Sequence, residues 1–240
     1  MILETRQLWC RFGGVAAVAG VDFQLEEGEV RCLIGANGAG KSTFFKMLTG
    51  QLRPTSGAIS VMGRDVTRLA PFEIARLGVG VKMQVPALFD GITVRESLAL
   101  GALRTLERRR VGDAVQAMLK QIQLEAEADV QVGLLSHGQR QWVELGMVLM
   151  ADPKLVLLDE PAAGMTRGEV EKTIALIGRL RGRHTVVVVE HDMHFVGRIA
   201  EKVTVFHRGM VLAEGSMDTI LRDSRVREVY LGRKAGGVRG

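Results

Sequence analysis

The chain has 240 residues, of which 47% are hydrophobic and 25% are charged, a composition that favours a folded protein with a substantial core over a disordered one. Its 32 basic and 27 acidic residues give a net charge of +5, but the basic run at Arg108-Arg109-Arg110 has no interleaved aromatic residues, so no nucleic acid is expected as a partner. No run approaches the ~20 apolar residues of a membrane-spanning helix, and the N-terminus does not resemble a secretory signal.

The first 83 residues predict strands separated by glycine-containing turns, together with one helix. The helix is expected at residues 41–49, where Gly50 ends it. Cys10 and Cys32 fall within apolar strands, which favours buried, reduced thiols in a cytosolic protein over a disulfide. The expected strands are residues 2–12, 21–26, 30–34, 58–62 and 79–83.

Residues 93–150 predict a helical stretch. Thr93 is followed three residues later by Glu96, the pattern of a helix-capping box. Continuous apolar strands that alternate with helices indicate a parallel sheet covered on both faces, with residues 85–150 inserted as a helical subdomain. Helices are expected at residues 94–107, 113–124 and 138–150, and buried-type strands return at residues 155–158 and 185–189.

A glycine-rich turn joins the expected strand at residues 30–34 to the first expected helix. Its sequence, GANGAGKST from Gly35 to Thr43, fits the pattern G-x-x-x-x-G-K-[ST] in the required strand-to-helix context. The glycines let backbone N–H groups approach phosphate oxygens, Lys41 would reach the β and γ phosphates, and Ser42 would ligate Mg²⁺. The alternative is an ordinary glycine-rich turn, but the pattern favours a bound polyphosphate.

Two adjacent carboxylates, Asp159 and Glu160, follow the apolar strand at residues 155–158. Carboxylates at the end of a buried strand are costly unless they meet a cation or water. Asp159 is therefore a candidate Mg²⁺ ligand, and Glu160 is a candidate for polarising a water that attacks phosphate. A simple polar exit from the strand is the alternative.

The segment LSHGQRQW opens the third expected helix. Ser136 can cap this helix and Gly138 allows a close backbone approach, so the segment is a second candidate site for an anion. A nucleotide held at residues 35–43 does not need a second such site, so the segment would meet a nucleotide bound by another subunit. Considered alone, it would be an ordinary capped helix.

These segments, in this order, resemble the motifs of the ATP-binding cassette (ABC) ATPases. Residues 35–43 are similar to the Walker A loop, LSHGQ at residues 135–139 to the signature, and LVLLD at residues 155–159 to Walker B. The resemblance covers residues 1–232 and implies an α/β fold with a P-loop NTPase ABC-ATPase core. It also implies an N-terminal antiparallel β subdomain, an inserted α-helical signature subdomain and a flexible C-terminal tail at residues 233–240.

The resemblance implies roles for single residues as well. ATP hydrolysis would use Lys41, Glu160 and the switch histidine His191, and Gln84 would be the glutamine of the Q-loop. Phe12 matches the aromatic position that stacks on adenine, although a lone phenylalanine is more often a core residue. The expected ATP contacts are Phe12, Gly35, Asn37, Gly38, Ala39, Gly40, Lys41, Ser42, Thr43, Gln84, Ser136, Gly138 and Gln139, and the expected Mg²⁺ ligands are Ser42, Gln84 and Asp159.

The resemblance further implies a peripheral subunit on the cytoplasmic face of the inner (plasma) membrane. Two cassettes, identical or different, would close head to tail around ATP and Mg²⁺ and drive two transmembrane permease subunits through residues 84–86 and 93–124. A substrate-binding protein would deliver the cargo. The combination of LSHGQ with AGMT is most similar to urea-importer cassettes, and branched-chain amino acid importers are the alternative. An exporter or a non-transport ABC ATPase is a less favoured reading.

Two residues depart from the common family pattern. Thr166 stands in the D-loop where aspartate is common, which predicts an altered contact across the dimer and two inequivalent ATP sites. His137 stands where most members carry glycine. No other His or Cys is spaced near it for metal binding, so His137 is expected to be a tolerated variant.

Overall fold

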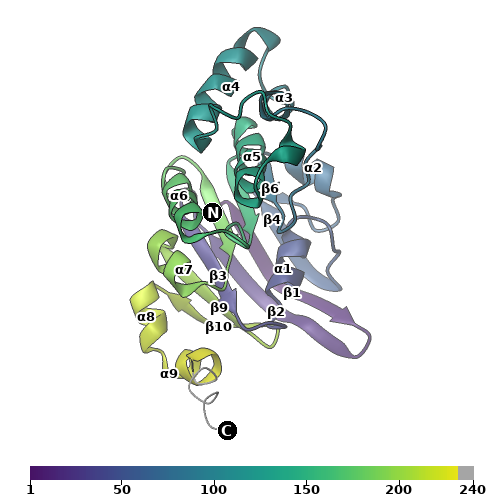
Figure 1. The fold of residues 1–240 in the computed structure, drawn as a ribbon. Helices are drawn as coiled ribbons and strands as arrows, with labels where there is room; N and C mark the ends of the chain where they lie inside the picture. The colour runs from purple at the N-terminus through teal and green to yellow at the C-terminus, as the bar shows by residue number, and fades with distance from the viewer. Residues whose placement is uncertain (232–240) are drawn as a thin grey trace.

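The computed structural model describes residues 1–231, and its first layer is an antiparallel sheet near the N-terminus (Figure 1). This sheet has the order β2-β1-β4-β5. The β1–β2 hairpin turns at Gly13, which has a left-handed φ of 56°, so β2 begins well before the expected residue 21. The strands are β1 (Leu3–Phe12), β2 (Val15–Leu25), β4 (Ser56–Val61) and β5 (Arg64–Asp65).

The second sheet has six strands in the order β10-β9-β3-β8-β7-β6. All neighbouring pairs from β9 to β6 are parallel, and β10 pairs antiparallel with β9. The order places β3 between two strands from the second half of the chain. The strands are β3 (Val30–Gly35), β6 (Val79–Lys82), β7 (Leu155–Asp159), β8 (Thr185–Val189), β9 (Lys202–His207) and β10 (Met210–Gly215).

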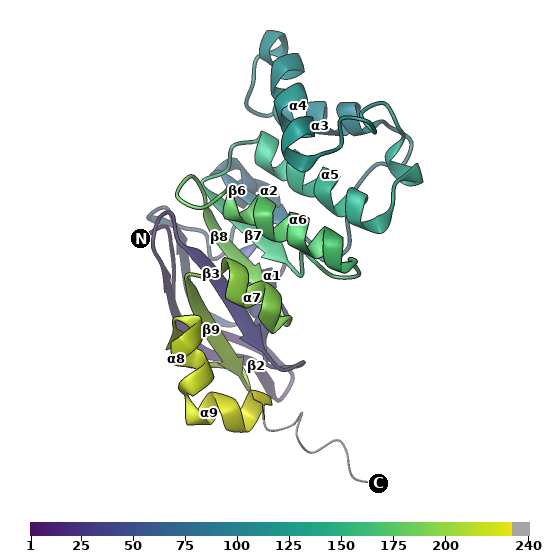
Figure 2. The ribbon, with the colours of Figure 1, turned by 60° about the vertical axis from the view of Figure 1, so that its left-hand side comes forward.

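Helices cover the parallel sheet, and α3, α4 and α5 form a separate group at one end of the molecule, opposite α8 and α9 (Figure 2). Among residues 1–231, no helix has both the length and the apolar character of a membrane span. The helices are α1 (Lys41–Leu48), α2 (Pro71–Arg76), α3 (Val94–Ala102), α4 (Arg108–Ile122), α5 (His137–Met150), α6 (Arg167–Gly178), α7 (Met193–Ile199), α8 (Met217–Arg222) and α9 (Ser224–Val226), with short turns of helix at Val132–Leu134 and Arg227–Leu231.

Alternate side chains of the buried strands enter two different cores. Cys32 and Ile34 of β3 belong to a cluster with residues of α3 to α8, whereas Leu33 packs with α1 and the antiparallel sheet. Both cysteines are free and buried, as expected. The α/β class, the antiparallel β subdomain and the helical insertion are therefore confirmed.

Two helix boundaries differ from those predicted. Helix α3 ends at Ala102 instead of residue 107, and α4 begins at Arg108 instead of residue 113. Arg108, Arg109 and Arg110 form the exposed first turn of α4. The tail expected at residues 233–240 lies outside the described residues.

Candidate functional site

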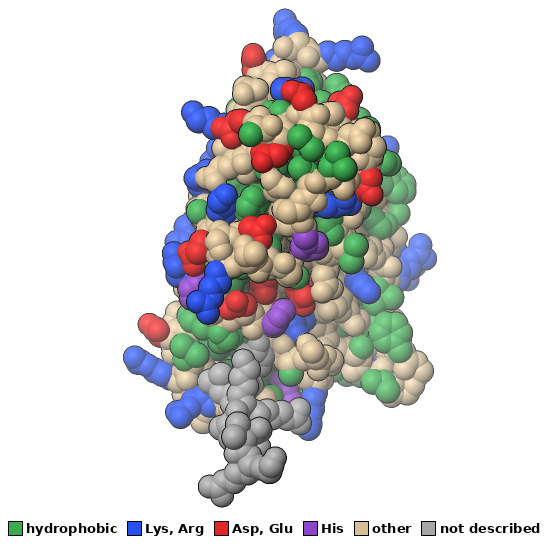
Figure 3. Space-filling view, in the orientation of Figure 1, with side chains coloured by type: hydrophobic (Ala, Val, Ile, Leu, Met, Phe, Trp, Pro, Cys, Tyr) green, Lys and Arg blue, Asp and Glu red, His purple; other side chains and the backbone are tan. Residues whose placement is uncertain are grey.

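The carboxyl ends of the parallel strands meet at one edge of the sheet, where α/β proteins place their ligands. Gly35 ends β3 and Asp159 ends β7, while Gln84 follows β6 and His191 follows β8. Carboxylate and histidine side chains gather across the middle of the molecular face in Figure 3, below the helical group. The fold thus brings together candidate residues that are far apart in the sequence.

The predicted phosphate loop leads from β3 into α1 with few side chains in its path. Gly40 precedes the helix with a φ of 104° and supplies no side-chain cap, so the first-turn N–H groups of α1 keep their capacity to bind an anion. Asn37, Gly38 and Ser42 are exposed, whereas the side chain of Ala39 is buried. The loop therefore presents mainly backbone donors.

Lys41 lies beneath this loop. Its side chain is only 7% exposed, and its Nζ donates to the carbonyl oxygens of Gly35 at 2.7 Å and Ala36 at 3.2 Å. Burial lowers the pKa of the Lys41 ammonium, while the carboxylates of Glu160 and Asp159 act in the opposite direction. The ammonium is therefore held at the base of the loop.

Replacement of Gly40 by alanine is expected to abolish nucleotide binding. A Cβ at Gly40 would collide with the carbonyl oxygen of Ala17, and the φ of 104° is unfavourable for any other residue. Gly112 in α4 is the matched control, because a Cβ there meets no atom within 4 Å and alanine stabilises a helix by about 1 kcal/mol. Equilibrium ATP binding and thermal unfolding of both variants test this. Parental ATP affinity in Gly40→Ala would contradict it.

Gln84, Glu160 and His191 form one group beside the phosphate loop. The Gln84 Nε2 donates to Glu160 Oε2 at 2.8 Å, and His191 Nδ1 lies 3.6 Å from Glu160 Oε1. Glu160 has a φ of 43°, which is uncommon for a residue with a side chain and is typical of functional sites. Its backbone is fixed by a 2.9 Å hydrogen bond from its N–H to Val189.

The predicted Mg²⁺ ligands fit the ion by their chemistry. Ser42, Gln84 and Asp159 offer hydroxyl, carboxamide and carboxylate oxygens, the hard ligands that Mg²⁺ prefers. Burial and the neighbouring Glu160 carboxylate raise the pKa of Asp159, with Lys82 the largest opposing charge. A cation at this position would relieve that cost, so the residues present suit the ion.

The signature segment starts α5 and is capped as expected. Ser136 Oγ accepts from the Gln139 N–H at 3.2 Å, and Gln139 Oε1 accepts from the Ser136 N–H at 3.0 Å. Gly138 lies against the carboxylate of Glu169, where a Cβ would collide. Gln139 also donates to Glu127 at 3.1 Å, so its side chain is engaged within its own subdomain.

Of the two remaining predicted residues, Thr43 is half-buried in the first turn of α1, and Phe12 lies at the end of β1 and is 53% exposed. The core alternative for this side chain is therefore wrong. An exposed aromatic ring at the end of a strand is available to stack on a base. In the described residues, no hydrogen bond or ion pair joins the signature to the phosphate loop, so the structure brings together the first group of candidates and leaves the signature apart.

Thr166 has a local role that the sequence analysis did not foresee. Its Oγ1 accepts from the Glu169 N–H at 3.4 Å, and the Glu169 carboxylate accepts from both the N–H and the Oγ1 of Thr166 at 2.8 Å. These hydrogen bonds lower the pKa of Glu169. Threonine and aspartate are both good N-caps, so Thr166 keeps the capping function that aspartate would have at the start of α6.

Several polar contacts behind the site were not predicted from the sequence. His137 Nε2 lies 3.1 Å from the carbonyl oxygen of Ala163 and 3.2 Å from Gln141 Nε2, so His137 has specific neighbours in the fold. Glu190 is 2% exposed and accepts from the N–H groups of Ala162 and His191. These contacts could have been predicted from the sequence, because each involves a polar residue within or next to an otherwise apolar helix or strand.

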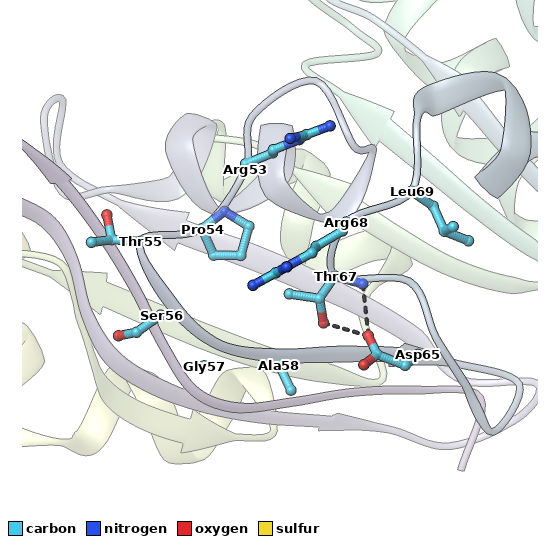
Figure 4. A pocket seen from close by; sticks show the side chains of 10 residues that line it. All are labelled: Arg53, Pro54, Thr55, Ser56, Gly57, Ala58, Asp65, Thr67, Arg68 and Leu69. Atoms are coloured by element: carbon cyan, nitrogen blue, oxygen red, sulfur yellow. Dashed lines mark hydrogen bonds between the residues drawn. The ribbon is translucent and has the colours of Figure 1, made fainter.

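A hollow of about 750 Å³ lies elsewhere, beside β4 and the segment that precedes α2 (Figure 4). Thr67 donates to Asp65 within it, and none of the predicted site residues lines it. It is therefore separate from the candidate site. The lining residues are Arg53, Pro54, Thr55, Ser56, Gly57, Ala58, Asp65, Thr67, Arg68 and Leu69.

Comparison with known proteins agrees with this geometry. The family described as ABC transporter matches residues 18–163, and the family described as branched-chain amino acid ATP-binding cassette transporter matches residues 210–236. The high-affinity branched-chain amino acid transport ATP-binding protein BraF of Pseudomonas aeruginosa is 36% identical, over 96% of this chain and 98% of its own. The corresponding protein LivG of Salmonella typhimurium is 35% identical over the same shares.

A solved structure of an ABC transporter cassette is similar to this chain as well. The crystal structure of the ADP conformation of MJ1267, an ATP-binding cassette of an ABC transporter, superposes with a TM-score of 0.86 at 29% identity, over 96% of this chain and 98% of that one. The comparisons do not support the preference for urea, and they favour the branched-chain amino acid alternative. With its fold, its motifs and its relatives in agreement, the chain belongs to the ABC transporter family, as an ATP-binding cassette that hydrolyses ATP.

Proposed function

We propose that this cassette energises the import of branched-chain amino acids. The match of residues 210–236 to the branched-chain amino acid cassettes carries this proposal, because it lies outside the segment that matches ABC transporters in general. These residues include β10, α8 and α9, and Val226 of α9 is buried in the core. The full-length similarity to BraF and LivG points to the same cargo.

The proposed reaction uses the group around Glu160. The backbone N–H groups of the phosphate loop and the Lys41 ammonium bind the phosphates of ATP. Glu160 polarises the attacking water, while Gln84 and His191 orient the Glu160 carboxylate from either side. Ser42, Gln84 and Asp159 would hold Mg²⁺, which when bound neutralises charge on the phosphates.

The proposed protein partners would bind at two surfaces, one for a second cassette and one for the permease. The signature at Ser136, Gly138 and Gln139 would complete the ATP site of a second cassette, and Phe12 would stack on the adenine of its own ATP. A groove of about 500 Å³ between α2, the loop after β6 and α3 would receive the permease. Phe72 and Phe89 line this groove and are 60% and 68% exposed, as suits an apolar docking surface.

Uptake measurements test the cargo. In a strain that lacks this chain, the parent protein is expected to restore uptake of labelled leucine, and Glu160→Gln is expected to leave uptake at background, since import needs hydrolysis. Labelled urea serves as the comparison cargo in the same strains. Restoration of urea uptake without leucine uptake would overturn the branched-chain assignment and leave the ATPase assignment intact.

A further inference from the structure

Helix α5 carries a polar stripe formed by His137, Gln141 and Glu144, of which His137 is exposed and the other two are buried. The spacing of four and then three residues places these side chains on one face of the helix. Gln141 is 1% exposed and Glu144 is 7% exposed. Buried polar groups destabilise a fold unless they are hydrogen-bonded, so the contacts of the stripe indicate what it does.

The stripe contacts the loop around Gln84 at two points and the last residue of β6 at a third. Glu144 Oε1 accepts from the N–H of Ala87, which follows Gln84 in the chain, at 3.1 Å. The other Glu144 oxygen lies 3.8 Å from the Nζ of Lys82, which precedes Gln84 and is 1% exposed. Between these contacts, Gln141 Nε2 donates to the main-chain oxygen of Gln84 at 3.4 Å.

Apolar packing holds this loop at Met83 and Leu88, which are partly buried against the two cores. Val85 is 77% exposed and Phe89 is 68% exposed, so neither of these side chains fixes the backbone in the core. The polar contacts from α5 add to this packing between Met83 and Leu88, where the Gln84 side chain reaches Glu160 Oε2 at 2.8 Å.

The stripe also contacts the segment that follows Glu160. His137 Nε2 lies 3.1 Å from the carbonyl oxygen of Ala163, whose N–H donates to the carbonyl oxygen of Glu160 at 3.1 Å. Gln141 Nε2 lies 3.2 Å from the same ring nitrogen, which makes only one of these two hydrogen bonds in a given tautomer. One helix face is thus in contact with the segments on both sides of the Gln84–Glu160 hydrogen bond.

We propose that Gln141 and Glu144 are positioning residues for ATP hydrolysis, which hold the Gln84 loop so that the Gln84 carboxamide meets Glu160. The inference rests on the proposed role of Gln84 and Glu160 in the reaction. It concerns kcat more than ATP binding, because neither residue contacts the phosphate loop.

A double-mutant cycle in the full chain tests the proposal. Gln141→Leu is expected to lower kcat about tenfold with little change in the KM for ATP, and to cause no further loss in a Gln84→Ala background. Glu144→Leu should behave alike, whereas Glu144→Gln, which keeps an acceptor for the Ala87 N–H, should recover most of the activity. Equal losses in both backgrounds would show a general structural effect and overturn the proposal.

Thr173→Val is the matched control for lost stability. Thr173 is 1% exposed and accepts from Trp142 Nε1 of α5 at 3.0 Å, away from the Gln84 loop. This variant should lower the melting temperature and leave kcat unchanged. Hydrogen exchange of the Ala87 amide should become faster in Glu144→Leu and not in Thr173→Val, and unchanged exchange in Glu144→Leu would overturn the proposal.

The outcomes separate this inference from the function on which it rests. Parental kcat in Gln84→Ala would overturn the role of Gln84 and, with it, the positioning role. A loss of activity in Gln84→Ala with parental kcat in Gln141→Leu and Glu144→Leu would overturn the positioning role alone.

Discussion

Lys41→Ala is expected to abolish ATP hydrolysis, with a loss in kcat/KM of about 1000-fold or more, because the transferred phosphate loses its cationic partner. The ammonium now satisfies the carbonyl oxygens of Gly35 and Ala36. Without it, these two oxygens would face the phosphates with no positive charge between them. The variant therefore loses the attraction between the ammonium and the phosphates and adds repulsion between the phosphates and the two carbonyl oxygens.

Phosphate release and equilibrium ATP binding measure this loss. Lys120→Ala is the matched control, because Lys120 lies exposed on α4 and its replacement removes the same charge from another part of the chain. Thermal unfolding should show that Lys41→Ala still folds, since the substitution also removes the cost of burying an ammonium. Parental turnover in Lys41→Ala would contradict the assignment of the phosphate loop.

The local chemistry of the site was predictable because short segments encode it. The glycines and Lys41 occupy one continuous turn, and Asp159 with Glu160 directly follows one apolar strand. The capping box of Thr93 with Glu96 and the helix cap at Ser136 were equally clear. In each case the residues that interact are neighbours in the sequence.

Contacts between distant segments were not predictable in this way. Strand β9 and the pairing of β3 with β9 and β8 were not predicted, since periodicity does not reveal which strands are neighbours. Gln141 and Glu144 are of residue types usually found on the solvent-exposed face of a helix, yet both are buried against the Gln84 loop. Burial of a polar side chain depends on the tertiary packing around it.

The cargo was the least accessible property. The similarity of LSHGQ and AGMT to urea-importer cassettes concerns residues near the nucleotide site, and the nucleotide motor carries little information about what is transported. The segment at residues 210–236 lies away from those motifs, and it matches the branched-chain amino acid cassettes. The helix cap made by Thr166 was not predicted either, and the altered dimer contact expected at this residue stays a prediction.

Glu160→Gln is expected to bind ATP normally and to hydrolyse it at least about 100-fold more slowly than the parent. An amide keeps the shape of the side chain but cannot polarise water as a carboxylate does. The amide oxygen can still accept from Gln84 Nε2, so the geometry of the group should survive. Bound ATP that is not hydrolysed should hold two cassettes together, and the variant should elute as a dimer in ATP and as a monomer without it.

Glu171→Gln is the matched control for this substitution. Glu171 lies on α6 with its side chain 49% exposed and pairs with Arg198 at the surface, so the same change there should leave hydrolysis at the parental rate. Phosphate release and size-exclusion chromatography measure the two effects. Parental turnover in Glu160→Gln would mean that another group orients the water, and the uncommon φ of 43° at Glu160 would then need a different explanation.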